Sequence, residues 1–416
     1  MKKEEQLSIR TRGILPIQYI KTLCRFGIIR SEDSFPIQEN QFQPNSMDLR
    51  LGTTAYRVRC SFLPENETVE SKIQKLALHS IDLENGAVLE QNCTYIIPLL
   101  ERLHLPLTGR MIPSQTQVGQ NYKKQDAGKV EPFFDPQVEG TLLTEEPLTA
   151  KANPKSSTGR LDIFTRLITD YSHRFEEIAA GYRGRLYLEV VPKSFPVRVK
   201  TGQRLNQLRM RHGVSVIGDQ DILHTHLKDP ILFDESGKPL PVDTLNVKDG
   251  LFMRVSLEGN EHGIVGYKAK KHGDLIDLEL TDHYSIRDFW DPIYAREDDY
   301  MILEPEAFYI FSSKERCRIP GHLAAEMVPY DTGSGELRTH YAGFFDSGFG
   351  GNIKDGGAKA VLEVRSHDVP FLVEDGQTFF RMVFEPNTEI PDVIYGKNLK
   401  SNYQGQALKL GKHFKD

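Results

Sequence analysis

The chain has 416 residues, of which 39% are hydrophobic and 26% charged, and its formal net charge is −6. This composition is typical of a globular protein, and the length allows two domains. Because the net charge is negative, no overall positive charge attracts the protein to nucleic acids or acidic membranes. An anionic ligand therefore needs a local basic cluster. The four cysteines form no CxxC pair, and no secretory leader or membrane-length apolar run occurs, so we expect free thiols in a soluble, cytoplasmic protein.

The first predicted element is a short amphipathic helix, because Ile17, Ile20, Leu23 and Phe26 follow helical spacing. After it the chain consists mostly of short β-rich segments bounded by Gly, Pro or Asp. The clearest of them are residues 48–60, 185–191, 195–202, 252–259, 360–366 and 379–386. Long helical periodicity is nearly absent, so the pattern predicts a mainly β fold of the barrel or jelly-roll kind with short helices.

Two stretches of the chain, residues 186–209 and 360–383, repeat one another without gaps. Each is predicted to be a strand, a turn, a second strand and a Gly-Gln turn into a third strand. The matched positions are Glu189 with Glu363, Pro196 with Pro370, and Gly202-Gln203 with Gly376-Gln377. A duplicated β domain explains the repeat, with a first domain over residues 1–215, containing a long polar insertion near 116–146, and a second over 216–416.

The stretch "PKSSTGR" is the best candidate for anion binding. Ser156 and Ser157 can donate hydroxyl and backbone N–H bonds, Arg160 can hold two phosphate oxygens with its planar guanidinium, and Lys155 adds a point charge. The corresponding region of the second repeat has no such motif. By themselves these residues do not separate a phosphate clamp from a polar turn.

Four segments in the same order resemble the dCTP deaminases of the dUTPase-like superfamily. They are "FQPNSMDLRLG" (residues 42–52), "PKSSTGR" (154–160), "GYRGRLYLEV" (181–190) and "YGKNLKSNYQGQ" (395–406). The resemblance implies two tandem dUTPase-like β-barrel or jelly-roll domains, a duplicated form of what the family usually encodes once. It also implies hydrolytic deamination of dCTP to dUTP and ammonia, and a phosphate-binding role for Lys155, Ser156, Ser157 and Arg160.

The resemblance places a catalytic glutamate on the "LEV" strand, where Glu189 and Glu363 both match. A carboxyl with a raised pKa can activate water and then protonate departing ammonia. The HxE and PCxxC elements of zinc deaminases are absent from the sequence, so we expect no zinc at the base. Family sites lie between neighbouring domains, which favours Glu363 facing the serine loop.

A second criterion points to the other glutamate. The family has an arginine before this strand, and Arg174 can fill that role for Glu189, whereas Phe344 stands there in the second repeat. This criterion favours Glu189 narrowly, and the choice between the two glutamates stays open.

The resemblance also bears on the C-terminal tail and on Mg²⁺. Tyr395 and Gln406 are expected near the base, sugar or phosphates of a bound nucleotide, although Asn402 replaces the tail lysine of the family. Mg²⁺ is expected to be held mainly through the triphosphate. Because family sites need neighbouring domains, we expect a homo-oligomer that binds dCTP or dUTP and no polymeric nucleic acid.

Two alternative functions remain. Asp346 in "AGFFDSGFGG" resembles the dUTPase aspartate that orients a water for attack on the α-phosphate, which would make the protein a dUTPase or a bifunctional enzyme that converts dCTP to dUMP. An ordinary Asp-x-Gly turn explains the same residues. The departures at Phe344 and Asn402 also allow a catalytically silent nucleotide-binding regulator.

Overall fold

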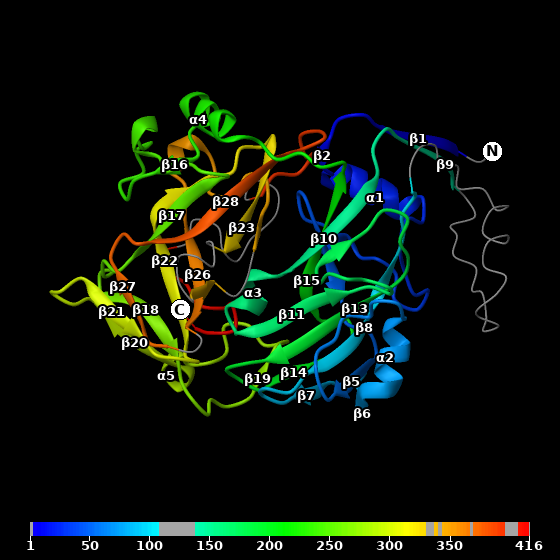
Figure 1. The fold of residues 1–416 in the computed structure, drawn as a ribbon, viewed down its shortest axis with the longest axis horizontal. Coiled ribbons are helices and arrows are strands. Elements are labelled where there is room, and N and C mark those ends of the chain that lie inside the picture. The colour runs from blue at the N-terminus through cyan, green and yellow to red at the C-terminus, as the bar shows by residue number, and fades with distance from the viewer. Residues whose placement is uncertain are drawn as a thin grey trace.

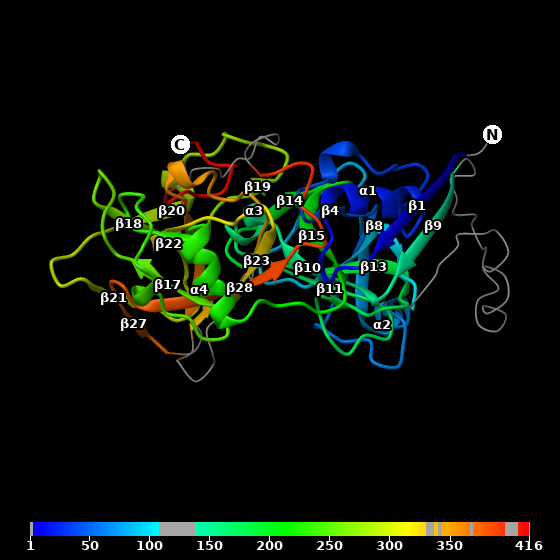
Figure 2. The same cartoon turned by 90° about the horizontal axis from the view of Figure 1, so that it is seen from above.

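The computed structural model describes residues 3–107, 138–329, 337–339, 343–366, 369–395 and 407–415. Two β-rich lobes lie side by side along the long axis, the first half of the chain in one and most of the second half in the other (Figures 1 and 2). The predicted mainly β fold with short helices is confirmed.

The first half contains helices α1, α2 and α3 and the strands up to β15. The helices are α1 Ile17–Arg25, α2 Val69–Leu76 and α3 Ser156–Gly159, with a 3₁₀ turn at Glu39–Gln41. The strands are β1 Lys3–Ile9, β2 Gly13–Ile14, β3 Ile29–Ser31, β4 Met47–Arg50, β5 Thr54–Val58, β6 Ala77–Asp82, β7 Ala87–Leu89, β8 Tyr95–His104, β9 Val138–Thr144, β10 Leu148–Pro154, β11 Ile163–Ile168, β12 Glu177–Ile178, β13 Arg183–Pro192, β14 Val197–Val199 and β15 Arg204–His212.

The second half contains α4, α5 and the strands from β16 onward. The helices are α4 Asp219–Lys228 and α5 Ile286–Phe289, with 3₁₀ turns at Val242–Thr244 and Ile353–Asp355. The strands are β16 Leu232–Phe233, β17 Leu251–Ser256, β18 Ile264–Ala269, β19 Ile276–Asp277, β20 Trp290–Tyr294, β21 Tyr300–Leu303, β22 Phe308–Cys317, β23 Leu323–Pro329, β24 Leu337–Thr339, β25 Phe344–Phe345, β26 Ala358–Ser366, β27 Phe371–Glu374 and β28 Thr378–Pro386.

The sheets that flank the site are mostly antiparallel. In the first half, β11-β13-β8-β5-β6 form one sheet with β3 beside β8, and β12-β10-β15-β2 form another with β4 beside β15. In the second half, β22 is the central strand that pairs with β16, β17, β18 and β26. Alternating apolar residues along these strands fill the space between sheets, as period-2 patterning requires.

The sequence repeat corresponds to a repeated run of elements. Strands β13, β14 and β15 occupy the first copy and β26, β27 and β28 the second. The Gly-Gln turn recurs in the same backbone conformation, with φ of +84° at Gly202 and +74° at Gly376. Glycine adopts this left-handed conformation without the penalty that a Cβ brings, which explains its presence in both copies.

The two lobes are joined by a continuous apolar core. Trp290 of β20 is fully buried and packs edge-on against Phe195 of the first half at a centroid separation of 5.6 Å. Strand β19 also pairs in parallel with β14. These contacts hold α3 between the lobes, as Figure 1 shows.

Part of the predicted insertion has regular structure: β9 pairs in parallel with β1 at the edge of the first lobe (Figure 1). The rest of that segment up to residue 137 lies outside the described residues. Among the helices of the described residues, none has both the length and the apolar character needed to cross a membrane.

Candidate active site between the two lobes

The residues of "PKSSTGR" form a single helical turn fixed to strand β15. Lys155 is extended and precedes α3, its backbone N–H donates to the Leu205 carbonyl at 3.0 Å, and the Thr158 hydroxyl donates to the same carbonyl at 2.7 Å. The turn ends at Asp162, which has a φ of +55°. Ser156 is exposed and Ser157 half-buried, so both hydroxyls remain accessible.

Glu363 of β26 reaches across from the second lobe to this turn. A Cβ placed on Gly159 would stand 2.6 Å from Glu363 Oε2, so the carboxylate lies directly against the glycine. Burial raises the pKa of the Glu363 carboxyl to about 8, a shift that the nearby Arg160 guanidinium opposes and the Asp162 carboxylate reinforces. A carboxyl with this pKa can both take up and release a proton near neutral pH.

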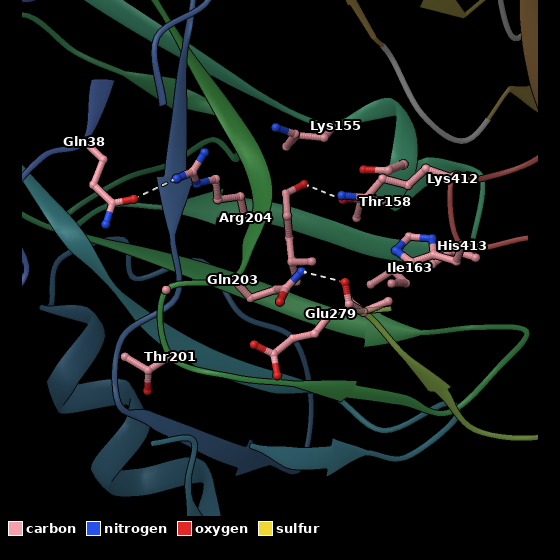
Figure 3. Close-up of a pocket in the computed structure, with 15 residues that line it drawn as sticks. Gln38, Lys155, Thr158, Ile163, Thr201, Gln203, Arg204, Glu279, Lys412 and His413 are labelled. Carbon is pink, nitrogen blue, oxygen red and sulfur yellow. Dashed lines mark hydrogen bonds between the residues drawn. The ribbon is translucent and has the colours of Figure 1, made fainter. Parts of the chain in front are cut away.

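A cavity of about 460 Å³ opens beside the same turn (Figure 3). Its polar wall carries Lys155 and Ser157 from the turn, Arg204 at the start of β15, and Lys412 and His413 from the C-terminal segment. In Figure 3 the labelled side chains Lys155, Arg204, Lys412 and His413 come from three separate parts of the chain and lie around one pocket.

The charges in this cavity are arranged around a buried carboxylate, Asp48 of β4. Lys155 donates to Asp48 Oδ2, and Arg204 Nη1 lies 3.9 Å from the same oxygen. Asp48 Oδ1 is buried and has no hydrogen-bond partner among the described residues. Burial lowers the pKa of the Lys412 ammonium, and the neighbouring cations Lys155 and Arg204 lower it further, which an anionic ligand would relieve.

His413 gives the cavity a neutral ring. Burial and the adjacent Lys412 hold the pKa of His413 at about 4, so the imidazole is uncharged at neutral pH. Its Nδ1 atom is buried without a partner among the described residues.

Glu189 lies in a different environment. Its side chain is 1% exposed and accepts hydrogen bonds from Arg166 at 2.6 and 3.0 Å, an ion pair within the first lobe. Arg174 does not join it, because its side chain is 74% exposed and lies 3.3 Å from Glu177. The structure therefore brings Glu363 to the serine turn and does not bring Arg174 to Glu189.

Asp346 is tied to the first lobe. It accepts a hydrogen bond from Arg209 at 2.7 Å and one from Ser46 at 3.2 Å, and the Arg209 guanidinium also lies 4.0 Å from the Phe344 ring centroid. Phe344, which stands where the family arginine was expected, thus forms a cation–π contact with an arginine from the other repeat.

The C-terminal segment supplies Lys412 and His413 to the cavity, but Tyr395 does not line it. Tyr395 packs near Phe349, with ring centroids 5.9 Å apart, and its backbone N–H donates to the Ser347 carbonyl at 2.9 Å. Gln406 lies outside the described residues. Farther on, the Lys409 carbonyl accepts a hydrogen bond from Arg160 at 2.9 Å, and Leu410 and Phe414 are buried in the apolar core that joins the two lobes.

Sequence reasoning missed Arg204, Lys412 and His413. The signal for the last two was present in "ALKLGKHF", where apolar residues recur in an otherwise polar terminus and indicate a segment that packs back. Arg204 had no sequence signal of its own, because its role depends on the position of Asp48 on another strand.

Comparisons with known proteins show the family to which this chain belongs. The family model described as the 2'-deoxycytidine 5'-triphosphate deaminase (DCD) N-terminal domain matches residues 11–116 and 135–214, and the model of the DCD C-terminal domain matches 218–414. The solved structure of 2'-deoxycytidine 5'-triphosphate deaminase from Agrobacterium tumefaciens superposes with a TM-score of 0.76 at 40% sequence identity, covering 91% of this chain and 100% of that chain. A comparison with curated protein sequences gave no match. The chain belongs to the 2'-deoxycytidine 5'-triphosphate deaminase family.

Proposed function

We propose that this protein deaminates dCTP to dUTP and ammonia, with Glu363 as its general acid–base at a site formed by both lobes of one chain. One observation carries the assignment: the Glu363 carboxyl, with a pKa raised to about 8, lies against Gly159 of the serine turn. Glu189, the alternative, is engaged by Arg166 within its own lobe.

The chemistry follows from the position of this carboxyl. As a carboxylate, Glu363 takes a proton from a water that adds to C4 of the cytosine ring. The same group then delivers a proton to the amino group, the C4–N bond breaks, and ammonia leaves. Burial from solvent keeps the pKa of the Glu363 carboxyl high enough for both proton transfers.

The triphosphate would lie along the turn and into the adjoining cavity. Ser156 and Ser157 supply hydroxyl and backbone donors, while Lys155, Arg204 and Lys412 supply positive charge. Arg160 ends the turn and lies close enough to Glu363 to lower the pKa of its carboxyl, so it would orient the nucleotide between phosphates and base.

The donor set also fits Mg²⁺ held mainly through the nucleotide. Asp48 Oδ1 is a buried oxygen with no hydrogen-bond partner among the described residues, on a carboxylate that pairs with the cavity-lining Lys155, and oxygen ligands suit Mg²⁺. When bound, the ion would neutralise charge on the phosphates. The tail residues Tyr395 and Gln406 would then close over the nucleotide.

The test is a comparison of Glu363→Gln with Glu189→Gln, assayed for ammonia release from dCTP in the presence of Mg²⁺. We expect Glu363→Gln to lose at least a hundredfold in kcat and Glu189→Gln to retain most of it. Equal activity of the two variants would contradict the assignment of Glu363.

Product analysis separates the remaining alternatives. dUTP as the product supports a deaminase, whereas dUMP and diphosphate would identify the bifunctional reaction. If neither product forms but dCTP still raises the melting temperature, the protein is a nucleotide-binding regulator.

A further inference from the structure

We propose that Asp162 and Arg365 act as a positioning pair that fixes the Glu363 carboxyl against the serine turn. This inference rests on the proposed role of Glu363 and adds two residues to it. Neither residue contacts the cavity, and both act through Glu363.

The pair joins the two segments that meet at the site. Glu363 and Arg365 lie two residues apart on β26, so their side chains project from the same face of the strand. Glu363 lies over Gly159, and Arg365 donates to the Asp162 carboxylate three residues farther along the facing segment. Two parallel contacts therefore set the position of β26 relative to the turn.

The pair is buried and held from several sides. The side chains of Asp162 and Arg365 are 0% and 5% exposed. Ser194 donates to the Asp162 carboxylate at 2.5 Å, and Arg365 donates a further hydrogen bond to the Glu306 carbonyl. A buried ion pair costs desolvation, so its value here lies in the fixed geometry that these hydrogen bonds impose.

The Asp162 charge also acts on the Glu363 carboxyl. From the first lobe, Asp162 raises the pKa of the Glu363 carboxyl and Arg160 lowers it, after burial has made the main shift. Arg365 comes from the strand of Glu363 itself and offsets the Asp162 charge through the ion pair. Asp162 thus bears on both the position and the proton affinity of Glu363.

The two repeats differ at this point. The second copy reads "LEVR" and the first "LEVV", so Val191 occupies the place of Arg365 after Glu189. The arginine is present only in the copy whose glutamate faces the serine turn. A purely structural ion pair gives no reason for that coincidence.

The experiment compares Asp162→Asn and Arg365→Lys with the unaltered protein. For Asp162→Asn we expect kcat for dCTP to fall by tenfold or more with KM changed less than threefold. The acid limb of kcat/KM should move to lower pH, because removal of the Asp162 charge lowers the pKa of Glu363. Arg365→Lys keeps the positive charge but cannot bond to both Asp162 and the Glu306 carbonyl, so kcat should fall while the acid limb of kcat/KM stays at the same pH. The matched control is Glu101→Gln, which breaks a buried ion pair with Arg50 in the same lobe and should lower stability without moving the pH profile.

A stability measurement without substrate tests the link between Asp162 and Glu363 independently of the proposed deaminase activity. In urea unfolding between pH 5 and pH 9, the pH at which stability stops falling should be lower in Asp162→Asn than in the unaltered protein, because only the folded-state pKa of Glu363 changes. An unaltered pH profile and an unaltered pH dependence of stability in Asp162→Asn would overturn the positioning role. A protein that releases no ammonia from dCTP would refute the proposed function, while the pH dependence of stability would still decide the link between Asp162 and Glu363.

Discussion

The Glu363 carboxylate and Gly159 lie so close together that an alanine Cβ at residue 159 would stand 2.6 Å from Oε2. The glycine is therefore needed for the approach of a catalytic carboxyl from the other lobe. It is not needed for backbone conformation, because its φ is not in the left-handed region.

Gly159→Ala should lower the rate of catalysis while leaving the stability of the fold nearly unchanged. The clashing atom is the end of a flexible side chain, so Glu363 can turn away at small cost to stability, but its carboxyl then leaves the position that the chemistry needs. We expect kcat to fall by roughly a hundredfold with little change in the urea midpoint. The control is Gly218→Ala, where the nearest atom is 3.8 Å away. Full activity in Gly159→Ala would show that the contact is not required.

The raised pKa of Glu363 predicts a pH-dependent change in stability. An acid whose pKa is higher in the folded than in the unfolded protein binds more protons when folded, so stability falls as pH rises from about 4.5 to about 8. Glu363→Gln removes this penalty. We expect the variant to gain on the order of a few kcal/mol relative to the unaltered protein between pH 5 and pH 9.

Urea unfolding of Glu363→Gln and of the unaltered protein at pH 5 and at pH 9 measures the change in their stability difference. A constant offset between Glu363→Gln and the unaltered protein across the range would mean that the Glu363 carboxyl titrates normally. That result would also remove the physical basis for its use as an acid–base group.

The sequence was sufficient for the parts of the protein that depend on local pattern. Strand alternation and the repeat predicted the β fold and the equivalence of Glu189 and Glu363. The serine turn was found because "PKSSTGR" concentrates its donors within seven residues.

The choice between the two glutamates depends on long-range packing and could not be made from sequence. Both stand in the same "LEV" context, yet Arg166 engages one and the serine turn faces the other. Arg166 lies on a neighbouring strand, β11, and a register shift of one residue would have pointed it away. The wider contacts of Asp346 and Arg365 likewise arise only once the lobes meet.

The cavity cations predict an effect on substrate affinity. Arg204→Ala and Lys412→Ala each remove one positive charge from the cavity, and a charge-assisted hydrogen bond to phosphate contributes roughly 1.5–3 kcal/mol. We expect KM for dCTP to rise about tenfold or more in each variant with kcat changed much less. The effect should shrink for dCMP, which lacks the distal phosphates.

Lys200→Ala is the matched control, because Lys200 pairs with Glu279 at 3.7 Å near the cavity without lining it. Its KM should stay within twofold of that of the unaltered protein. Equal changes in all three variants would indicate a general electrostatic effect in place of direct phosphate contact.

The last prediction concerns Asp346 and its buried partner. Arg209 is fully buried and Asp346 only 9% exposed, so Asp346→Asn leaves a buried guanidinium without its counter-charge. Breaking such a pair costs roughly 3–5 kcal/mol, and the urea midpoint should fall accordingly. The exposed pair of Arg296 and Asp298 provides the control, since Asp298→Asn should not change the midpoint measurably. If Asp346 also orients a hydrolytic water, the unaltered protein will release diphosphate and Asp346→Asn will lose that product. An unchanged midpoint would contradict the stabilising role of the pair with Arg209.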